Sequence, residues 1–227
     1  MSTDLSAPNR APIEPAPAVL PLDYYLILHE PGGPPAGLHV EEFVLAADHT
    51  AIGVDSAGWA PGETAWWSSA EFALGIRRDA RLRSRVCPAS RAAAEATYRE
   101  LDGDELPAEP LLRKYFWDRH LLATAAPLRL SPDTPPPGFH ERRLYRTLFA
   151  GDLSPAALTR IAQEKRSIGD DVVELTVRSI GNGVAWGADL TVLLATDEDK
   201  AVGPILHEIR TTLRGEGLIP VTVERFA

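Results

Sequence analysis

The sequence predicts an α+β protein: a β-rich N-terminal module with two helices, followed by an α-β-β-α-β unit of the ferredoxin-like kind. Three observations lead to this prediction. Short runs of aromatic and β-branched residues dominate the first part of the chain. Helical and alternating patterns follow one another in the second part. Between them, the proline-rich stretch 131–138, SPDTPPPG, cannot continue a regular element and is expected to be a linker.

The N-terminal module is expected to occupy 22–130. Before it, residues 1–21 are expected to form a disordered tail, because this stretch is rich in proline and holds only scattered apolar residues. The first three strands are predicted from their aromatic and β-branched residues. They cover 24–28, 38–46 and 50–54.

Residues 66–76 admit two interpretations. Ser68 and Glu71 have the spacing of a capping box, which favours a helix. The apolar residues from Phe72 to Ile76 alternate with period two, which favours a strand. We prefer the strand.

Two helices are expected to close the module, over 90–101 and 110–123. The tryptophans at positions 59, 66 and 67 are large side chains in a turn-rich region, and we expect them in the core.

The C-terminal unit is expected to occupy 139–227. Ser154 and Pro155 suit the N-cap and the first position of a helix, which would run to about Lys165. A strand, a hairpin turn, a strand, a helix and a closing strand should follow. The strands and the turn are expected at 173–178, 181–183, 190–195 and 220–226. The helix could be capped by Thr196, but Pro204 would interrupt it, so we expect its regular part to begin only there. Its apolar face runs from Val202 to Leu213, and Gly215 or Gly217 ends it.

The composition excludes several classes of function. The chain has 227 residues and a formal net charge of −9, which argues against a nucleic-acid partner. The single cysteine, Cys87, excludes an internal disulfide framework, and we expect it to be buried. No apolar run approaches the roughly 20 residues that span a bilayer, so we expect a cytoplasmic protein without a membrane partner. The excess of arginine over lysine is typical of high-GC bacterial genomes.

Charge is segregated along the first part of the chain. Residues 11–76 hold nine acids and no lysine or arginine, and a basic segment follows at once. We favour internal neutralisation, in which this segment lies beside the acidic sheet. Alternatively, a strand would place Arg81, Arg83 and Arg85 on one face, where they could bind the phosphate or carboxylate of a partner. The arginines of the segment are Arg77, Arg78, Arg81, Arg83, Arg85 and Arg91.

A metal site is a further hypothesis. If strands 24–30 and 38–45 pair with Glu30 opposite Leu38, then His29 faces His39 and Glu41 lies two residues further on the same face. Two imidazoles and a carboxylate could bind zinc or iron and leave a position open for water. The alternative is two partly exposed histidines at the end of a hairpin, with no cofactor.

The sequence contains none of the motifs GxxxxGK[ST], GxSxG or HExxH. The leading hypothesis is therefore a non-enzymatic accessory protein that binds a protein partner through the segregated charges. One alternative is a binder of an anionic small ligand, such as a nucleotide, in a cleft between the two parts. Another is a small metal-dependent enzyme that uses His29, His39 and Glu41. The sequence leaves the oligomeric state open.

Overall fold

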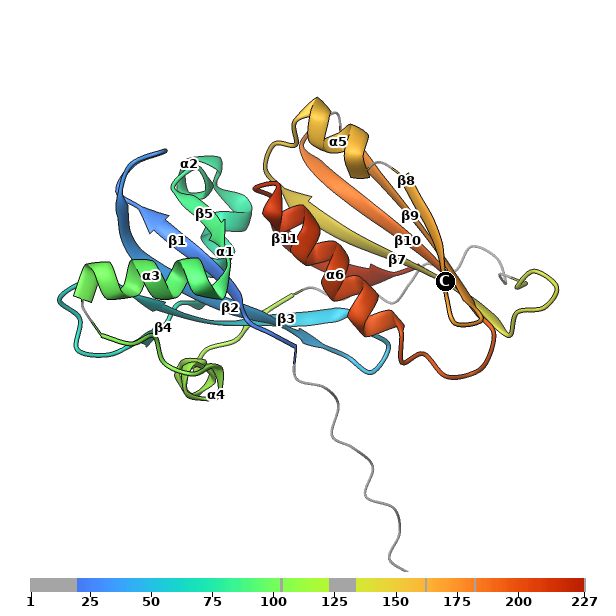
Figure 1. Ribbon diagram of the computed structural model, residues 1–227, viewed down its shortest axis with the longest axis horizontal. Helices are drawn as coiled ribbons and strands as arrows, with labels where there is room; N and C mark the ends of the chain where they lie inside the picture. Colours follow the sequence, from blue (N-terminus) through green and yellow to red (C-terminus); the bar gives the residue numbers. More distant parts are fainter. Residues whose placement is uncertain (1–19, 103, 123–133, 162, 182, 227) are drawn as a thin grey trace, which may run out of the picture.

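In the computed structural model of the protein, two antiparallel sheets lie side by side (Figure 1). A mixed α and β protein is confirmed, with about 27% of residues in helices and 40% in strands. The expected tail falls outside the described residues except for its last two positions, and so do the first three residues of the expected linker. The structure describes residues 20–102, 104–122, 134–161, 163–181 and 183–226.

The N-terminal sheet has the strand order β4-β3-β2-β1-β5, and β6 also pairs with β3. The three expected strands are confirmed, and the second and third are longer than predicted. All pairings of the sheet are antiparallel. The strands are β1 (Asp23–Leu28), β2 (Pro35–Leu45), β3 (Ala51–Trp59), β4 (Trp67–Ser68), β5 (Val86–Ala89) and β6 (His120–Leu121).

One face of this sheet is apolar. Leu38, Val40 and Trp59 point from it toward α3 (Arg91–Asp102) and α4 (Glu109–Leu112), which close a buried cluster. The helix expected over 90–101 is confirmed. Trp59 and Trp66 are buried as expected, but Trp67 is 36% exposed on the short edge strand β4.

The helix expected over 110–123 is wrong. The chain forms only α4 and a 3-10 turn, Arg113–Tyr115, and then enters β6. Phe116 ends the turn with a ψ of 69°, and the backbone of β6 pairs with β3. Pairing with a distant strand therefore overrides the local helical pattern.

The strand preferred over 66–76 is wrong for most of its length, because only Trp67–Ser68 form a strand, β4. Residues Ala70–Arg78 form helix α1, and Ala80–Arg83 form the short helix α2. Ala73, Ile76 and Arg77 are the buried residues of α1. Their spacing of three and four is the helical one, and the alternation seen in the sequence arose because Phe72 and Ile76 share a face of the helix.

The C-terminal sheet has the strand order β11-β7-β10-β9-β8. The strands and the helix expected from 173 to 226 are present, although the first expected helix ends at Ile161. The expected turn at 181–183 includes Asn182, which lies outside the described residues. The elements of the C-terminal part are β7 (Glu141–Ala150), α5 (Pro155–Ile161), β8 (Gln163–Ile168), β9 (Asp171–Ile180), β10 (Ala185–Leu194), α6 (Val202–Gly215) and β11 (Ile219–Arg225).

Two strands of this sheet, β7 and β8, were not predicted. In β7 the inward positions include Arg143 and Thr147, which hide the apolar alternation of a half-buried strand. The edge strand β8, with the sequence QEKRSI, has almost no apolar residue. The predicted order α-β-β-α-β is therefore incomplete, and the ferredoxin-like arrangement stays a prediction.

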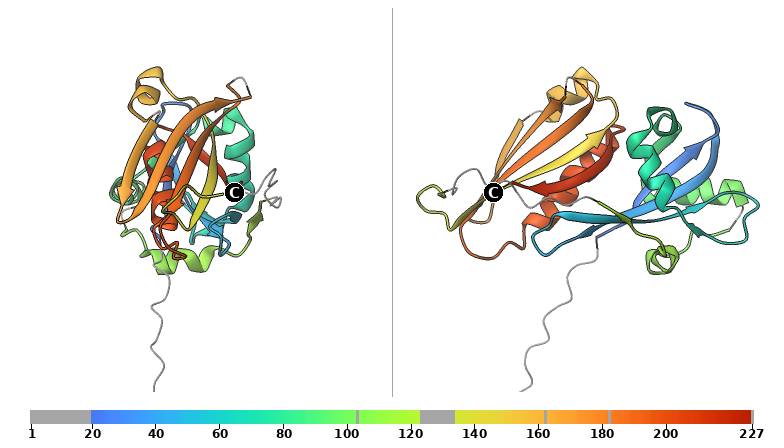
Figure 2. Two further views of the ribbon diagram at one scale, coloured as in Figure 1. Left: turned by 90° about the vertical axis from the view of Figure 1, so that its right-hand side faces the viewer. Right: turned by 180° about the vertical axis from the view of Figure 1, so that it is seen from behind.

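Helix α6 lies at the junction of the two sheets (Figure 2). Ile205, Ile209 and Leu213 pack on the C-terminal sheet. Arg210 and Arg214 extend toward β1 and β2 of the N-terminal sheet. Because one side of α6 is apolar and another is charged, the helix joins the two parts of the molecule.

Cys87 is exposed on β5, so the expectation of a buried cysteine is wrong. Within the described residues, no helix is both long enough and apolar enough to cross a bilayer.

Candidate functional site

The structure does not bring the basic segment into one row. Because residues 80–83 are helical, Arg81 and Arg83 lie on α2, whereas Arg85 directly precedes β5. Arg83 donates to the backbone carbonyl of Ile76 at 3.0 Å and so holds the end of α1. Arg85 donates through Nε to the backbone carbonyl of Leu28, also at 3.0 Å. These two side chains are part of the fold.

Arg91 lies at the start of α3, where it donates to the hydroxyl of Tyr24 and to the backbone carbonyl of Pro107. Arg78 and Arg81 are exposed, and the structure gives their side chains no hydrogen bond or ion pair with the described residues. Only these two members of the segment are therefore free to meet a partner.

The histidine pair is not formed. Leu38 pairs with Leu26 rather than with Glu30, so His39 faces Tyr25 and not His29. His29 is exposed beyond the end of β1. Across the part of the chain that the structure describes, no group of three or more His, Cys, Asp or Glu side chains could hold a metal ion. The proposed zinc or iron ligands are thus not assembled.

His39 and Glu41 nevertheless meet, in a buried polar network on the second face of the N-terminal sheet. Glu41 accepts from both terminal nitrogens of Arg77, at 2.9 and 2.7 Å. His39 lies 3.1 Å from Glu41 through Nε2 and 3.0 Å from Ser69 Oγ through Nδ1. The hydroxyl of Tyr25 donates to Glu41 at 3.1 Å. The carboxylate is therefore surrounded by donors.

This environment fixes the charge of Glu41. Burial alone would raise the pKa of its carboxyl, but the charge of Arg77 and the hydrogen bonds from His39 and Arg77 hold the pKa well below its ordinary value. Burial raises the pKa of Tyr25, which keeps its hydroxyl protonated. Glu41 and Arg77 thus form a buried, charged pair.

Helix α6 extends this network across the junction. Arg214 donates through Nη1 to Asp23 at 2.7 Å, through Nε to the hydroxyl of Tyr25 at 3.0 Å and through Nη2 to the backbone carbonyl of Tyr24 at 2.8 Å. Burial raises the pKa of Asp23, although the charge of Arg214 opposes this shift. One arginine of the C-terminal part therefore holds three groups of β1.

Arg210, one turn before Arg214, has no such carboxylate. It is 5% exposed, and its Nε has no hydrogen-bond partner in the described part of the molecule. Its Nη2 lies 3.3 Å from Nδ1 of His207, and its guanidinium lies 5.0 Å from the centre of the Phe43 ring. Burial lowers the pKa of Arg210, although the charge of nearby Asp23 opposes this shift. It is a buried cation whose charge no acidic side chain in the described residues pairs directly.

A cavity of about 360 Å³ lies beside Arg210. Its apolar wall comes from the residues just before β1 and from β2, and its remaining lining residues are charged. The lining residues are Leu20, Pro21, Asp23, Glu42, Phe43, Val44, Leu45, Asp55, Arg119 and Arg210.

Each carboxylate of this cavity has a guanidinium of its own. Asp23 pairs with Arg214, as described above. Glu42 accepts from Arg113 at 2.8 Å. Asp55 accepts from Arg119 through both oxygens, at 2.7 and 2.8 Å. Arg210 is therefore the cation of the cavity lining that has no hydrogen bond to a carboxylate among the described residues, although the charge of Asp23 acts on it.

A second cavity, of about 300 Å³, shares Pro21 and Asp23 with the first. It is lined by Arg91 and Arg214, both of which already have partners. Of the predicted basic segment, only Arg91 lines either of these two cavities. The arginines of this second cavity already have hydrogen-bond partners, so the cavity beside Arg210 is the stronger candidate site.

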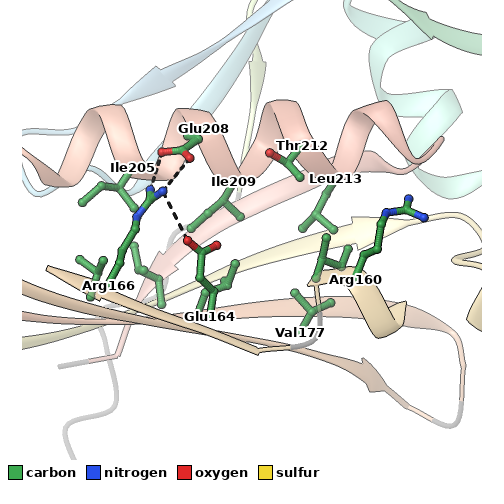
Figure 3. A pocket seen from close by; sticks show the side chains of 13 residues that line it. Arg160, Glu164, Arg166, Val177, Ile205, Glu208, Ile209, Thr212 and Leu213 are labelled. Atoms are coloured by element: carbon green, nitrogen blue, oxygen red, sulfur yellow. Dashed lines mark hydrogen bonds and ion pairs between the residues drawn. The ribbon is translucent and has the colours of Figure 1, made fainter. Parts of the chain in front are cut away.

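A third hollow lies between α6 and the C-terminal sheet (Figure 3). Apolar side chains such as Val177 and Leu213 form its interior, and Arg166 spans its edge to contact Glu208 and Glu164. Its volume is about 70 Å³, below the roughly 300 Å³ at which ligand pockets begin. It is a gap in the core.

No motif in the sequence points to four residues of this site: Asp23, Tyr25, Arg210 and Arg214. A signal existed for the two arginines, because residues 202–213 have an apolar face and Arg210 and Arg214 are spaced by one turn on another face. The partner of Arg214 lies 191 positions away, and no local pattern connects the two.

No protein-family model matches the sequence, and searches of curated proteins and of solved structures found no significant match. The function of the protein is therefore inferred from the geometry of the site alone.

Proposed function

We propose that the protein binds a small anionic ligand in the cavity beside Arg210, at the junction of its two parts. The observation that supports this function is the buried guanidinium of Arg210, which borders a cavity and lacks a carboxylate partner among the described residues. A buried charge that no carboxylate contacts directly is costly, and an anion that reaches it removes part of that cost.

The surrounding network supports the same function. Arg210 lies on α6, whose next turn is held by Asp23, Tyr25 and the backbone of β1 through Arg214. A guanidinium that is fixed in advance loses less conformational entropy when a ligand binds. The cavity volume of about 360 Å³ suits a small molecule.

The test is thermal unfolding of the protein with and without millimolar acetate, hexanoate, inorganic phosphate and AMP at constant ionic strength. At least one of these anions should raise the melting temperature of the wild type, because a ligand that binds only the folded state stabilises it. The rise should be absent in Arg210→Met and retained in Arg81→Met, which removes an exposed arginine whose side chain has no partner among the described residues. Equal rises in both variants would contradict the proposal.

A second candidate function is the binding of an acidic protein partner. The free arginines Arg78 and Arg81 support it, and so do exposed apolar side chains on neighbouring elements. Trp117 is 69% and Leu121 is 72% exposed, and the charge of Arg78 acts on His120 beside Leu121. Exposed aromatic residues near cations are typical of interfaces.

This candidate predicts a partner of high acidic content. Native mass spectrometry of the protein from its own host should show a second polypeptide, and the double variant Arg78→Glu/Arg81→Glu should release it. Arg160→Glu, which reverses an exposed charge on α5, is the control. Retention of the polypeptide by the double variant would reject this surface.

A further inference from the structure

We infer that the ligand of the cavity beside Arg210 is a monocarboxylate with a short apolar body, and not a phosphate or a nucleotide. This inference depends on the proposed function and adds the chemical class of the ligand. Three features of the cavity lead to it: the number of unpaired charges, the carboxylates around them and the apolar wall.

The first feature is the single unpaired charge. Among the side chains that line the cavity, Arg119 is engaged with Asp55 through two hydrogen bonds, and only Arg210 is without a carboxylate. Its Nε is unpartnered in the described structure, and its Nη2 has only a contact of 3.3 Å to an imidazole nitrogen of His207. A carboxylate carries one charge and matches the planar fork of a guanidinium.

The second feature is the group of three carboxylates that line the cavity. Asp23, Glu42 and Asp55 all line the same cavity, and their own arginines already neutralise them. A second negative charge on the ligand would lie close to these carboxylates without a free cation to meet it. Dianions such as phosphate monoesters are therefore disfavoured.

The third feature is the apolar wall. Leu20, Pro21, Val44 and Leu45 line the cavity together with Phe43, whose ring lies against the Arg210 guanidinium. Alkyl groups of a ligand would leave water on this surface, and each buried methylene group then adds to affinity. A carboxylate attached to a short alkyl chain uses both the cation and this wall.

The experiment is isothermal titration calorimetry of the wild type with five compounds: hexanoate, acetate, hexanamide, adipate and inorganic phosphate. Hexanoate should bind at least about tenfold more tightly than its uncharged analogue hexanamide, because a hydrogen bond to a charged group is among the strongest. Adipate and phosphate should bind at least about tenfold more weakly than hexanoate, for the electrostatic reason above.

Three variants locate the site. Arg210→Met should lose the preference for hexanoate over hexanamide, and Arg210→Lys should retain part of it, because the charge remains without the fork. Leu45→Gln should weaken hexanoate more than acetate, since only the longer chain reaches the apolar wall. Arg81→Met should bind hexanoate as the wild type does.

The outcomes separate the ligand class from the proposed function. If phosphate or adipate binds more tightly than hexanoate and Arg210→Met abolishes this binding, the cavity is an anion site but the monocarboxylate class is overturned. If hexanoate does not bind, that class is overturned as well. If hexanoate binds equally to the wild type and to Arg210→Met, both the ligand class and the proposed function are wrong.

Discussion

The two faces of the N-terminal sheet are both buried, but by opposite chemistry. On one face, Trp59 packs against Tyr98 of α3 with ring centres 4.4 Å apart, and the cluster around them is apolar. On the other face, Glu41 and Asp23 are buried against arginines from α1 and α6. Adjacent positions on the same strand therefore serve two kinds of interface.

The difference between the faces shows how the molecule divides stability from orientation. Apolar contacts are non-directional, and the burial of apolar surface alone holds α3 on its face of the N-terminal sheet. Buried ion pairs add little net stability, because desolvation offsets their attraction, but each pair requires one geometry. We interpret the charged face as the device that sets how α6, and with it the C-terminal sheet, is seated on the N-terminal sheet.

The charged face should be the more sensitive to a single substitution. Glu41→Leu should lower the free energy of unfolding by about 3–5 kcal/mol, because Arg77 is left as an uncompensated buried charge. Urea denaturation measures this change. The double variant Glu41→Leu/Arg77→Met should lose much less, since neither charge remains. Equal losses in the single and double variants would contradict the argument from the unpaired charge.

The apolar face should respond to cavity formation alone. Leu38→Ala should cost about 2–5 kcal/mol of unfolding free energy, the usual range for a buried leucine. Because no charge is involved, the loss measured by urea denaturation should be the same at pH 7 and pH 4.5. A loss that changes strongly between these two pH values would show that the two faces are coupled.

Acid should weaken the charged face specifically. The pKa of Glu41 in the folded protein lies well below its ordinary value of 4.5, so its contribution to stability is complete above about pH 4.5 and is lost as pH falls below that value. Asp23, with a raised pKa, acts in the opposite direction. Chemical denaturation at several pH values between 3 and 5 gives the unfolding free energy as a function of pH. This free energy should change less with pH in Glu41→Leu/Arg77→Met than in the wild type.

Arg210 should be the exception on the charged face. Arg210→Met should change the unfolding free energy by no more than about 1 kcal/mol, or raise it, because it removes a buried cation that lacks a carboxylate. Arg214→Met, one turn along the same helix, should cost about 3–5 kcal/mol, since Asp23 loses its partner. If Arg210→Met were as costly as Arg214→Met, Arg210 would be structural rather than available to a ligand.

The sequence predicted those elements whose patterns are local. The helix over 90–101 and the strand over 173–178 each show a single apolar periodicity within their own length. Prediction from the sequence failed where a short pattern fits both the helical and the strand period, as at 66–76. It also failed where polar residues occupy inward positions, as in β7.

The candidate site could be predicted only in fragments. His39, Glu41 and Arg77 were all singled out, but for other roles, because the register of β1 and β2 was set four residues away from the observed one. Gly33 donates to the backbone carbonyl of Glu30 at 2.9 Å and so closes the turn that follows β1. The pairing of β1 with β2 therefore ends at Leu28. Arg210 meets Phe43 across 167 positions, a distance over which a single sequence carries no signal.

The long reach of Arg214 has a consequence for how the chain is made. Synthesis proceeds from the N-terminus, so β1 and β2 leave the ribosome long before α6. The ion-pair partner of Asp23 is Arg214, which is synthesised 191 positions later. Until then the sheet can acquire its apolar cover from α3 but not the guanidinium that joins its other face to α6. A chain interrupted before residue 202 would therefore present an open, partly charged surface, the kind of intermediate that chaperones and proteases recognise.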